Sequence, residues 1–290
     1  METQKSYEVQ TTGTLYLVPT PIGNLGDMTF RAVEVLKEVD WIASEDTRNT
    51  RKLLTHFDIL TQQLSFYEHN TQERIPQLIA MLESGESIAQ VSDAGMPSIS
   101  DPGHELVQAC IEASIPVVPL PGANAGITAL IASGLTPQPF TFIGFLKRKK
   151  KDQRAQWKAL EQKEETMIFY ESPYRLKETI ENLAAVLGEE RRVVICRELT
   201  KRYEEFVRGN AKDVLEWLNQ KTVKGEICLL VEGNQNPEAV VEKEPFPEDL
   251  KEHVEIVMQE EDVSSKDAIK QVAKLRNRKK QEVYQAYHEI

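Results

Sequence analysis

The feature that most limits how this chain can fold is a repeated order of strand-like run, loop and helix-like run across residues 14–134. Residues 14–19, 41–45 and 87–93 are short and apolar, and segments with apolar residues at helical spacing lie between them. Strands that alternate with helices in this way form a mainly parallel sheet with helices on its faces. The sequence therefore predicts an α/β fold.

A second block repeats this alternation further along the chain. Its expected strands are residues 166–173, 191–199, 204–209 and 225–233, with helices at 174–187 and 211–219. We therefore predict two α/β domains, residues 1–140 and 141–235. Residues 236–290 would form an acidic linker and a basic helical tail. The polar, Pro-containing stretch 234–247 is the expected linker, and the helices of the tail begin at the N-cap residue Ser264.

Three loops rich in Gly, Pro and small residues follow predicted strands, at residues 19–26, 93–103 and 121–126. The carboxyl ends of parallel strands meet at one edge of a sheet, so these loops should together form one ligand pocket. They contain neither Gly-x-Gly-x-x-Gly nor Gly-Lys-Ser/Thr, and no Lys or Arg. A pocket poor in cations favours S-adenosylmethionine (SAM), which has no phosphate, over a nucleoside triphosphate.

The charges are unevenly distributed along the chain. The formal net charge is −11, and residues 232–262 carry eleven of the acids. Two short segments are nevertheless strongly basic: Lys147, Arg148, Lys149, Lys150 and Lys151, and a turn with Arg276, Arg278, Lys279 and Lys280. An acidic body with local basic patches is typical of an enzyme that touches an anionic polymer at chosen points. A solvated helix face is the alternative interpretation of each patch.

Several other classes of protein are disfavoured. The five His residues are scattered and no paired Cys motif occurs, so we expect no metal site. No apolar run reaches about 18 residues, and no signal peptide is apparent, so we expect no membrane span. The three Cys residues are far apart, as in a cytoplasmic protein with buried, reduced thiols.

Several long motifs resemble one known family. GTLYLVPTPIGNLGDMTFRAVEVLKEVDWIASEDTRNTRKLL, QVSDAGMPSISDPG and PLPGANAGITAL resemble the tetrapyrrole-methylase-fold enzymes. YESPYRL, CRELTKRYEE and GEICLLVEG extend the resemblance to about residues 13–233. The chain is most similar to the branch that methylates a cytidine 2'-hydroxyl in 16S ribosomal RNA. Its first loop, PTPIGNLGDMT, lacks the Gly-x-Gly-x-Gly-Asp pattern of true tetrapyrrole methylases.

The resemblance implies a fold, a cofactor and partners. It implies two α/β domains around a cleft that binds SAM, and usually a homodimer. The implied substrate is the decoding region of 16S ribosomal RNA in the small ribosomal subunit. Motif by motif, the implied cofactor contacts of this chain are Ile22, Ala94, Gly95, Met96, Ile99, Gly122, Ala123, Tyr170, Leu199 and Ile227.

Methyl transfer to a ribose hydroxyl would be helped by a carboxylate that accepts the hydroxyl proton. Acidic residues at predicted strand ends are the candidates for this base: Asp46 and Glu171 foremost, then Glu45, Asp93 and Asp101. Arg48 and Arg51 follow the same strand as Asp46 and are candidates for contacts with RNA phosphate. A pairing of Glu45 with Arg48 that merely fixes the loop is the alternative.

Two other functions stay open at the level of sequence. One is a SAM-dependent methyltransferase that acts on a tetrapyrrole-like small molecule. The other is a non-catalytic, ribosome-associated RNA-binding protein that uses the C-terminal helices. The departure in the first loop and the basic patches speak against the former. The three clustered loops speak against the latter, because a simple binder needs no such pocket.

Overall fold

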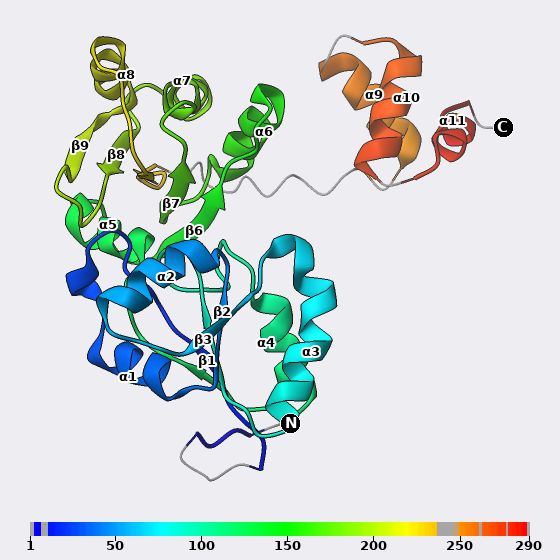
Figure 1. Cartoon of the computed structure of the whole chain (residues 1–290). Coiled ribbons are helices and arrows are strands. Elements are labelled where there is room, and N and C mark those ends of the chain that lie inside the picture. Colours follow the sequence, from blue (N-terminus) through cyan, green and yellow to red (C-terminus); the bar gives the residue numbers. More distant parts are fainter. Residues whose placement is uncertain are drawn as a thin grey trace. The chain divides into compact units, whose positions relative to one another are not determined.

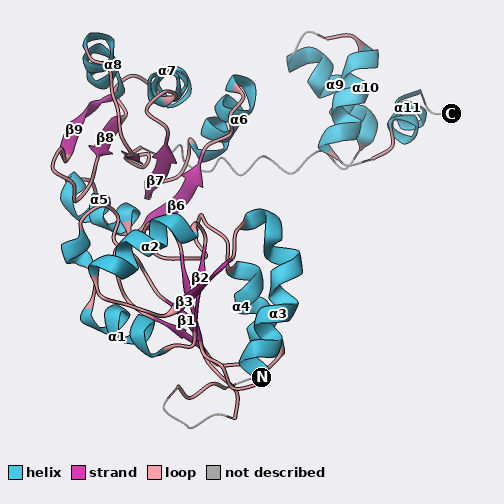
Figure 2. Cartoon of the chain, viewed as in Figure 1, coloured by secondary structure: helices cyan, strands magenta, loops and turns pink. Residues whose placement is uncertain are grey.

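The structure, a computed structural model, describes residues 3–6, 11–236, 247, 249–260, 263–276 and 278–288. The chain divides into two compact units, Met1–Gln235 and Asn236–Ile290. The larger unit contains two five-stranded sheets, each with helices on its faces (Figures 1 and 2). The predicted fold class, two α/β parts followed by C-terminal helices, is thus confirmed.

The first sheet is parallel throughout, with the strand order β3-β2-β4-β1-β5. Its strands are β1 (Leu15–Leu17), β2 (Trp41–Ser44), β3 (Gln62–Ser65), β4 (Ile88–Val91) and β5 (Val117–Pro119). Its helices are α1 (Phe30–Glu38), α2 (Thr47–His56), α3 (Thr71–Glu83) and α4 (His104–Glu112). Successive side chains of a strand point to opposite faces. Ile88 therefore joins the core under α3 and α4, whereas Ala89 joins the core under α1 and α2.

The second sheet is mixed, with the order β6-β7-β10-β8-β9. Its strands are β6 (Phe140–Phe145), β7 (Thr166–Glu171), β8 (Arg192–Arg197), β9 (Glu205–Asn210) and β10 (Ile227–Val231). Only β6 and β7 run parallel, so the parallel order predicted for the first block does not extend to the second. One face is covered by α6 (Lys150–Leu160), α7 (Leu176–Leu187) and α8 (Ala211–Gln220).

The other face of the second sheet is covered by α5 (Ala125–Ser133), which follows the last strand of the first sheet. A Cβ atom on Gly126 would lie 3.3 Å from a methyl group of Ile168, so the helix approaches β7 closely. Arg208 of β9 donates hydrogen bonds to the carbonyl oxygens of Ala132 (2.7 Å) and Ser133 (3.1 Å). A cation at these last carbonyls also suits the helix dipole. Helix α5 therefore ties the two sheets together.

The smaller unit has its own apolar core, formed by α9 (Leu250–Glu260), α10 (Ser265–Leu275) and α11 (Lys280–His288). Ser264 caps α10 as predicted, because its side-chain oxygen accepts a hydrogen bond from the Asp267 amide. Helix α9 was not expected from the sequence, and the predicted linker at 234–247 lies largely outside the described residues. Among the described helices, none is long and apolar enough to cross a membrane.

Candidate functional site

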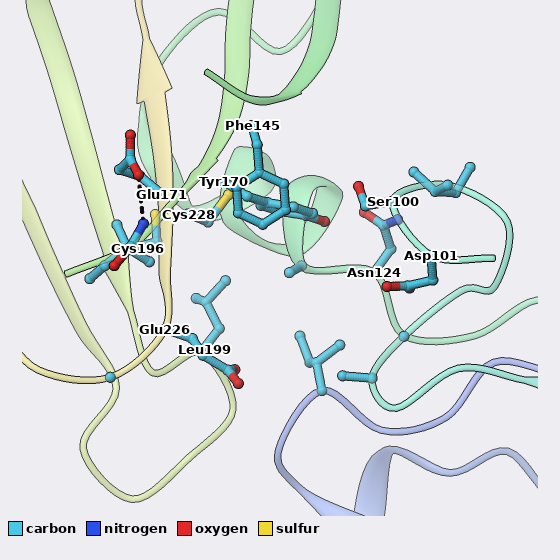
Figure 3. Close-up of a pocket in the computed structure, with 18 of the residues that line it drawn as sticks. Ser100, Asp101, Asn124, Phe145, Tyr170, Glu171, Cys196, Leu199, Glu226 and Cys228 are labelled. Carbon is cyan, nitrogen blue, oxygen red and sulfur yellow. Dashed lines mark hydrogen bonds between the residues drawn. The ribbon is translucent and has the colours of Figure 1, made fainter. Parts of the chain in front are cut away.

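A cavity of about 400 Å³ lies in the larger unit, where the loops of the first sheet meet the second sheet. Figure 3 shows Asp101 and Asn124 on one side of this cavity and Leu199, Cys196 and Cys228 on the other. The first sheet contributes loop residues that follow β1, β4 and β5. The second contributes the ends of β6, β7, β8 and β10 and the loops next to them. The predicted convergence of the three loops on one pocket is therefore observed.

Eight of the ten residues predicted to contact a cofactor line this cavity: Ile22, Ala94, Gly95, Met96, Ile99, Tyr170, Leu199 and Ile227. Gly122 and Ala123 are not in the lining. A Cβ atom on Gly122 would lie only 2.5 Å from the Cβ of Pro19, so this glycine lets the third loop pack against the first. Gly122 thus affects the cavity indirectly, because it allows the first and third loops to pack together.

Hydrogen bonds hold the first two loops together beside the cavity. The backbone groups of Thr20 and Gly95 exchange two hydrogen bonds of 3.0 Å each. Behind the second loop, the side-chain amide of Gln90 on β4 donates a hydrogen bond of 2.7 Å to the Pro102 carbonyl. The next residue, Gly103, has φ +142° and is the N-cap of α4, which starts at His104. The loop is therefore anchored to a central strand.

Several lining residues were missed by the sequence reasoning, among them Ser100, Asn124, Phe145, Cys196, Glu226 and Cys228. Asn124 could have been found, since it lies in the third predicted loop and caps α5 by accepting a hydrogen bond from the Ile127 amide. Cys196 and Cys228 could not, because they face the cavity only through the pairing of β8 with β10, where they lie opposite each other.

Asp46 caps α2 and does not line the cavity. Its carboxylate accepts hydrogen bonds from the Arg48 amide (2.8 Å) and from the Arg48 guanidinium (2.8 and 3.1 Å). These bonds with Arg48 lower the pKa of Asp46 to about 2. A carboxylate with so low a pKa and such a position is a poor proton acceptor. The geometry therefore gives Asp46 the role of a helix cap.

Glu171 lines the cavity, but its carboxylate is already bonded. One oxygen accepts from the Ser172 amide (2.8 Å) and lies 3.3 Å from the Arg175 guanidinium, and the other accepts from the Thr179 hydroxyl (2.7 Å). The Glu171 side chain is 0% exposed. A buried carboxylate with these partners orders the turn between β7 and α7. Both Glu171 oxygens are therefore engaged within the protein.

Asp101 is a different case, since it lines the cavity and, among the residues that the structure describes, forms no ion pair and caps no helix. Burial raises the pKa of Asp101, the charge of Asp93 raises it further, and a hydrogen bond from Ser92 lowers it in part. Burial likewise raises the pKa of nearby Glu45, which does not line the cavity. A carboxyl group with a raised pKa that faces a cavity is suited to accept a proton.

The cavity walls are mostly apolar and aromatic. The ring of Tyr170 packs edge-on against Phe142 (5.2 Å between centroids) and Phe145 (5.8 Å), and burial raises the Tyr170 pKa to about 12. The lining, all of it within the described residues, contains no Lys or Arg. A ligand with phosphate groups would lack a cationic partner here. A sulfonium ligand would find carboxylates and aromatic faces, which attract cations.

The three thiols, of which Cys196 and Cys228 line the cavity, should be chemically inert in the folded protein. Burial raises the pKa of Cys196 and of Cys110 to about 12, and that of Cys228 further still. Since the thiolate is the reactive form, iodoacetamide at pH 8 should leave all three cysteines unmodified. Intact-protein mass spectrometry would show this, with the guanidinium-unfolded chain, labelled three times, as the control. Rapid labelling of the native protein would contradict the burial.

The basic residues predicted to contact RNA lie in different settings. Lys147, Arg148, Lys149, Lys150 and Lys151 are all exposed, and they begin two residues after the cavity residue Phe145. Arg51 is exposed on α2, whereas Arg48 is engaged with Asp46. In the smaller unit, the Arg276 guanidinium donates to His253 Nδ1 (3.0 Å) and to the Pro247 carbonyl, which fits a role within that unit.

Comparisons with known proteins agree with this geometry. Residues 14–215 match the family described as Tetrapyrrole (Corrin/Porphyrin) Methylases. Over the full length of both chains, the sequence is 54% identical to Ribosomal RNA small subunit methyltransferase I of Streptococcus pyogenes serotype M18. It is also 54% identical to the protein of that name from Bacillus subtilis, over 95% of this chain and 94% of the relative.

Solved structures share the fold at low sequence identity. The structure of uroporphyrin-III C-methyl transferase from Thermus thermophilus, complexed with S-adenyl homocysteine, aligns with a TM-score of 0.55 at 17% identity. That alignment covers 76% of this chain and 97% of the other. The methyltransferase CobJ aligns with a TM-score of 0.59 at 18% identity, over 79% and 97% of the two chains.

Proposed function

Since the chain belongs to the family of tetrapyrrole (corrin/porphyrin) methylases, we propose that it transfers the methyl group of SAM to 16S ribosomal RNA, at the 2'-hydroxyl of a cytidine in the decoding region. The observation that carries this proposal is the full-length similarity to rRNA small subunit methyltransferases, joined to an apolar cavity at the loops expected to bind SAM. Such an enzyme works in the cytoplasm, where ribosomal subunits are assembled.

The cavity residues fit SAM better than they fit a phosphorylated cofactor. Ile22 and Met96 on one side, and Leu199 and Ile227 on the other, would enclose it and keep water away. Bound there, SAM supplies an electrophilic methyl group. The residues of the chain then have two tasks, which are to hold the ribose hydroxyl in line with that group and to accept its proton.

We assign the second task to Asp101. Of the five carboxylates considered from the sequence, Asp101 and Glu171 line the cavity, and the Glu171 oxygens are bonded within the protein. The Asp101 carboxylate would take the hydroxyl proton as the ribose oxygen becomes nucleophilic. A pKa raised by burial makes this carboxylate a stronger base than an exposed one.

The exposed basic cluster Lys147–Lys151 supports an RNA substrate, because it begins two residues after the cavity residue Phe145. Reversing three charges, as in Lys147→Glu, Lys149→Glu and Lys150→Glu, should flatten the dependence of RNA affinity on salt. Each phosphate contact that is lost should remove roughly 0.7–0.9 from the slope of log K against log salt. A titration of small subunits at several salt concentrations measures the slope, and an unchanged slope would count against this cluster.

We also propose a homodimer. Helix α5 is apolar on almost every side, and its outer residues Ile127 and Ile131 are 43% and 77% exposed, with Phe140 nearby in sequence at 40%. A helix that is apolar all round is normally covered. A second copy of the chain would cover it, which sedimentation velocity would detect as a doubled mass. A monomer at micromolar concentration would refute the dimer.

A tetrapyrrole-like small molecule is the second candidate substrate, favoured by the solved structures that share the fold. One experiment distinguishes the RNA substrate from the small-molecule substrate. It measures methyl transfer from radiolabelled SAM to small ribosomal subunits from a strain without this gene, and the product is mapped by mass spectrometry. Label on one cytidine 2'-oxygen is the expected result, and subunits from the parent strain should take up none. No label on such subunits, while SAM still binds, would overturn the RNA substrate.

A further inference from the structure

A second pocket in the larger unit, separate from the cavity proposed to bind SAM, combines cations with a half-buried tryptophan ring. It has a volume of about 340 Å³ and lies at the end of α8. Its lining includes Arg197, Trp217, Lys221 and Lys224 and only one acid, Glu205. This volume is near the lower limit of the pockets that bind small ligands, roughly 300 Å³. Its lining is rich in cations, whereas the lining of the larger cavity has no Lys or Arg.

Hydrogen bonds from Arg197 fix one side of this pocket. The Arg197 guanidinium donates to the Glu205 carboxylate (2.9 Å) and to the Lys224 carbonyl (3.3 Å), which fixes the loop after α8 to the sheet. The Arg197–Glu205 pair leaves Lys221 and Lys224 as the net positive charge. Both are exposed, and the Lys221 ammonium lies 5.3 Å from the centre of the Trp217 ring. A cation and an indole are therefore presented together.

The loop backbone adds hydrogen-bond donors. Within the described part of the chain, the backbone amides of Thr222, Val223 and Lys224 donate to no protein acceptor. Free amides beside lysines suit an anionic group, and the half-buried face of Trp217 suits a flat, apolar one. A nucleotide carries both groups, a phosphate and a base.

The position of the pocket ties it to the cofactor cavity. Lys224 is followed directly by Gly225, Glu226 and Ile227, which line that cavity. Arg197 lies opposite Ile227 in the pairing of β8 with β10, and its neighbour Cys196 faces the cavity. The two pockets thus open on opposite faces of one sheet edge. The two linings therefore adjoin at Lys224 and Gly225, which are consecutive residues.

We propose that this basic aromatic pocket binds a nucleotide of the single-stranded RNA next to the methylated one, with its base on Trp217 and its phosphate at Lys221 and Lys224. The proposal rests on the proposed function for the identity of the RNA. Stacking on an aromatic side chain and pairing of phosphates with lysines are the ordinary means of binding single strands.

The test compares the double variant Lys221→Glu, Lys224→Glu with Lys212→Glu. The latter reverses one charge at an exposed position of α8 outside the pocket. With small ribosomal subunits as the substrate, the double variant should raise KM roughly tenfold and leave kcat and SAM affinity unchanged. Lys212→Glu should behave as the parent does. An unchanged KM for the double variant, with methyl transfer intact, would overturn the pocket and leave the proposed function standing.

A second readout does not depend on methyl transfer. A short single-stranded oligocytidylate should quench the fluorescence of Trp217, and the quenching should vanish in Trp217→Phe, which keeps an aromatic ring. It should also vanish in the double variant. If the rRNA substrate fails but this quenching pattern holds, the pocket stands without the proposed function. Equal quenching by polyglutamate, or none by oligocytidylate, would overturn a nucleotide site.

Discussion

Replacing Asp101 by Asn is expected to lower kcat for methyl transfer by about 10²–10⁴-fold, the usual contribution of a general base. The side chain keeps its shape but loses the ability to accept a proton, so SAM affinity should stay close to that of the parent. Single-turnover transfer to small ribosomal subunits, together with calorimetric titration of SAM, separates the two effects. Equal loss of SAM binding and of turnover would instead make Asp101 part of the cofactor wall.

The pH dependence gives the same assignment a second test. Asp101 acts as a base only when ionised, so activity should fall as the pH drops through its pKa. Burial raises that pKa, which places the fall at a higher pH than an exposed aspartate would give. The acid limb of the kcat profile should be absent in the Asn variant. An identical acid limb in both proteins would assign it to another group.

The stability of the Asp101→Asn variant should move in the opposite direction to its activity. A folded-state pKa above the unfolded value means that ionising Asp101 costs folding free energy. This cost grows as the pH rises from the unfolded pKa to the folded pKa, and it is constant above that range. At neutral pH the Asn variant should therefore unfold at the same temperature as the parent or at a higher one.

Asp46→Asn is the matched control for this substitution. Asparagine caps helices about as well as aspartate, so α2 should keep its start. The residue lies outside the cavity, so kcat should change little. A large loss in Asp46→Asn together with a normal Asp101→Asn would make Asp46, and not Asp101, the proton acceptor.

Replacing Gly103 by Ala is expected to cost about 2–5 kcal/mol of unfolding free energy and most of the SAM affinity. The new Cβ atom would lie 1.9 Å from the Gln90 side-chain nitrogen and 2.2 Å from the Ser98 hydroxyl. Gln90 is 1% exposed and bonded to the Pro102 carbonyl, so moving it would leave a buried amide unpaired. The backbone at φ +142° adds strain for any residue but glycine.

Gly134→Ala provides the comparison. Gly134 ends α5 at φ +80°, and a Cβ atom added there would meet nothing within 4 Å, so only the backbone penalty of about 1–2 kcal/mol applies. Differential scanning calorimetry with and without SAM measures both variants. Similar losses of unfolding free energy in the two variants would show that Gln90 and Ser98 can move aside at little cost.

The first sheet and its loops were predictable because local pattern and global position agree there. A strand, a small-residue loop and a helix recur, and parallel strands place every such loop at one edge. Residues such as Ile22 and Met96 could therefore be assigned to a pocket from the sequence, with help from the family resemblance. The C-terminal helices were less predictable, since α9 was not expected from the sequence.

The second sheet shows what sequence could not give. Which side of β8 faces the cavity depends on a mixed sheet order, so Cys196 was not separable from its neighbours in the strand. The choice among carboxylates was also beyond reach. Asp46 and Asp101 lie in loops after strands and Glu171 ends β7, and only the partners of each carboxylate separate the helix cap, the buried and bonded carboxylate, and the cavity carboxylate with a raised pKa.

Because of helix α5, neither half of the larger unit should be replaceable on its own by the corresponding half of another protein. It follows the first sheet in the chain, yet its buried face belongs to the core of the second. A fragment that stops at residue 140 would carry an apolar helix without its cover, and the remaining fragment would expose the matching face of its sheet. Neither half should persist alone, but the two should recognise each other, which makes the junction near residue 140 a natural place to split the protein for fragment complementation.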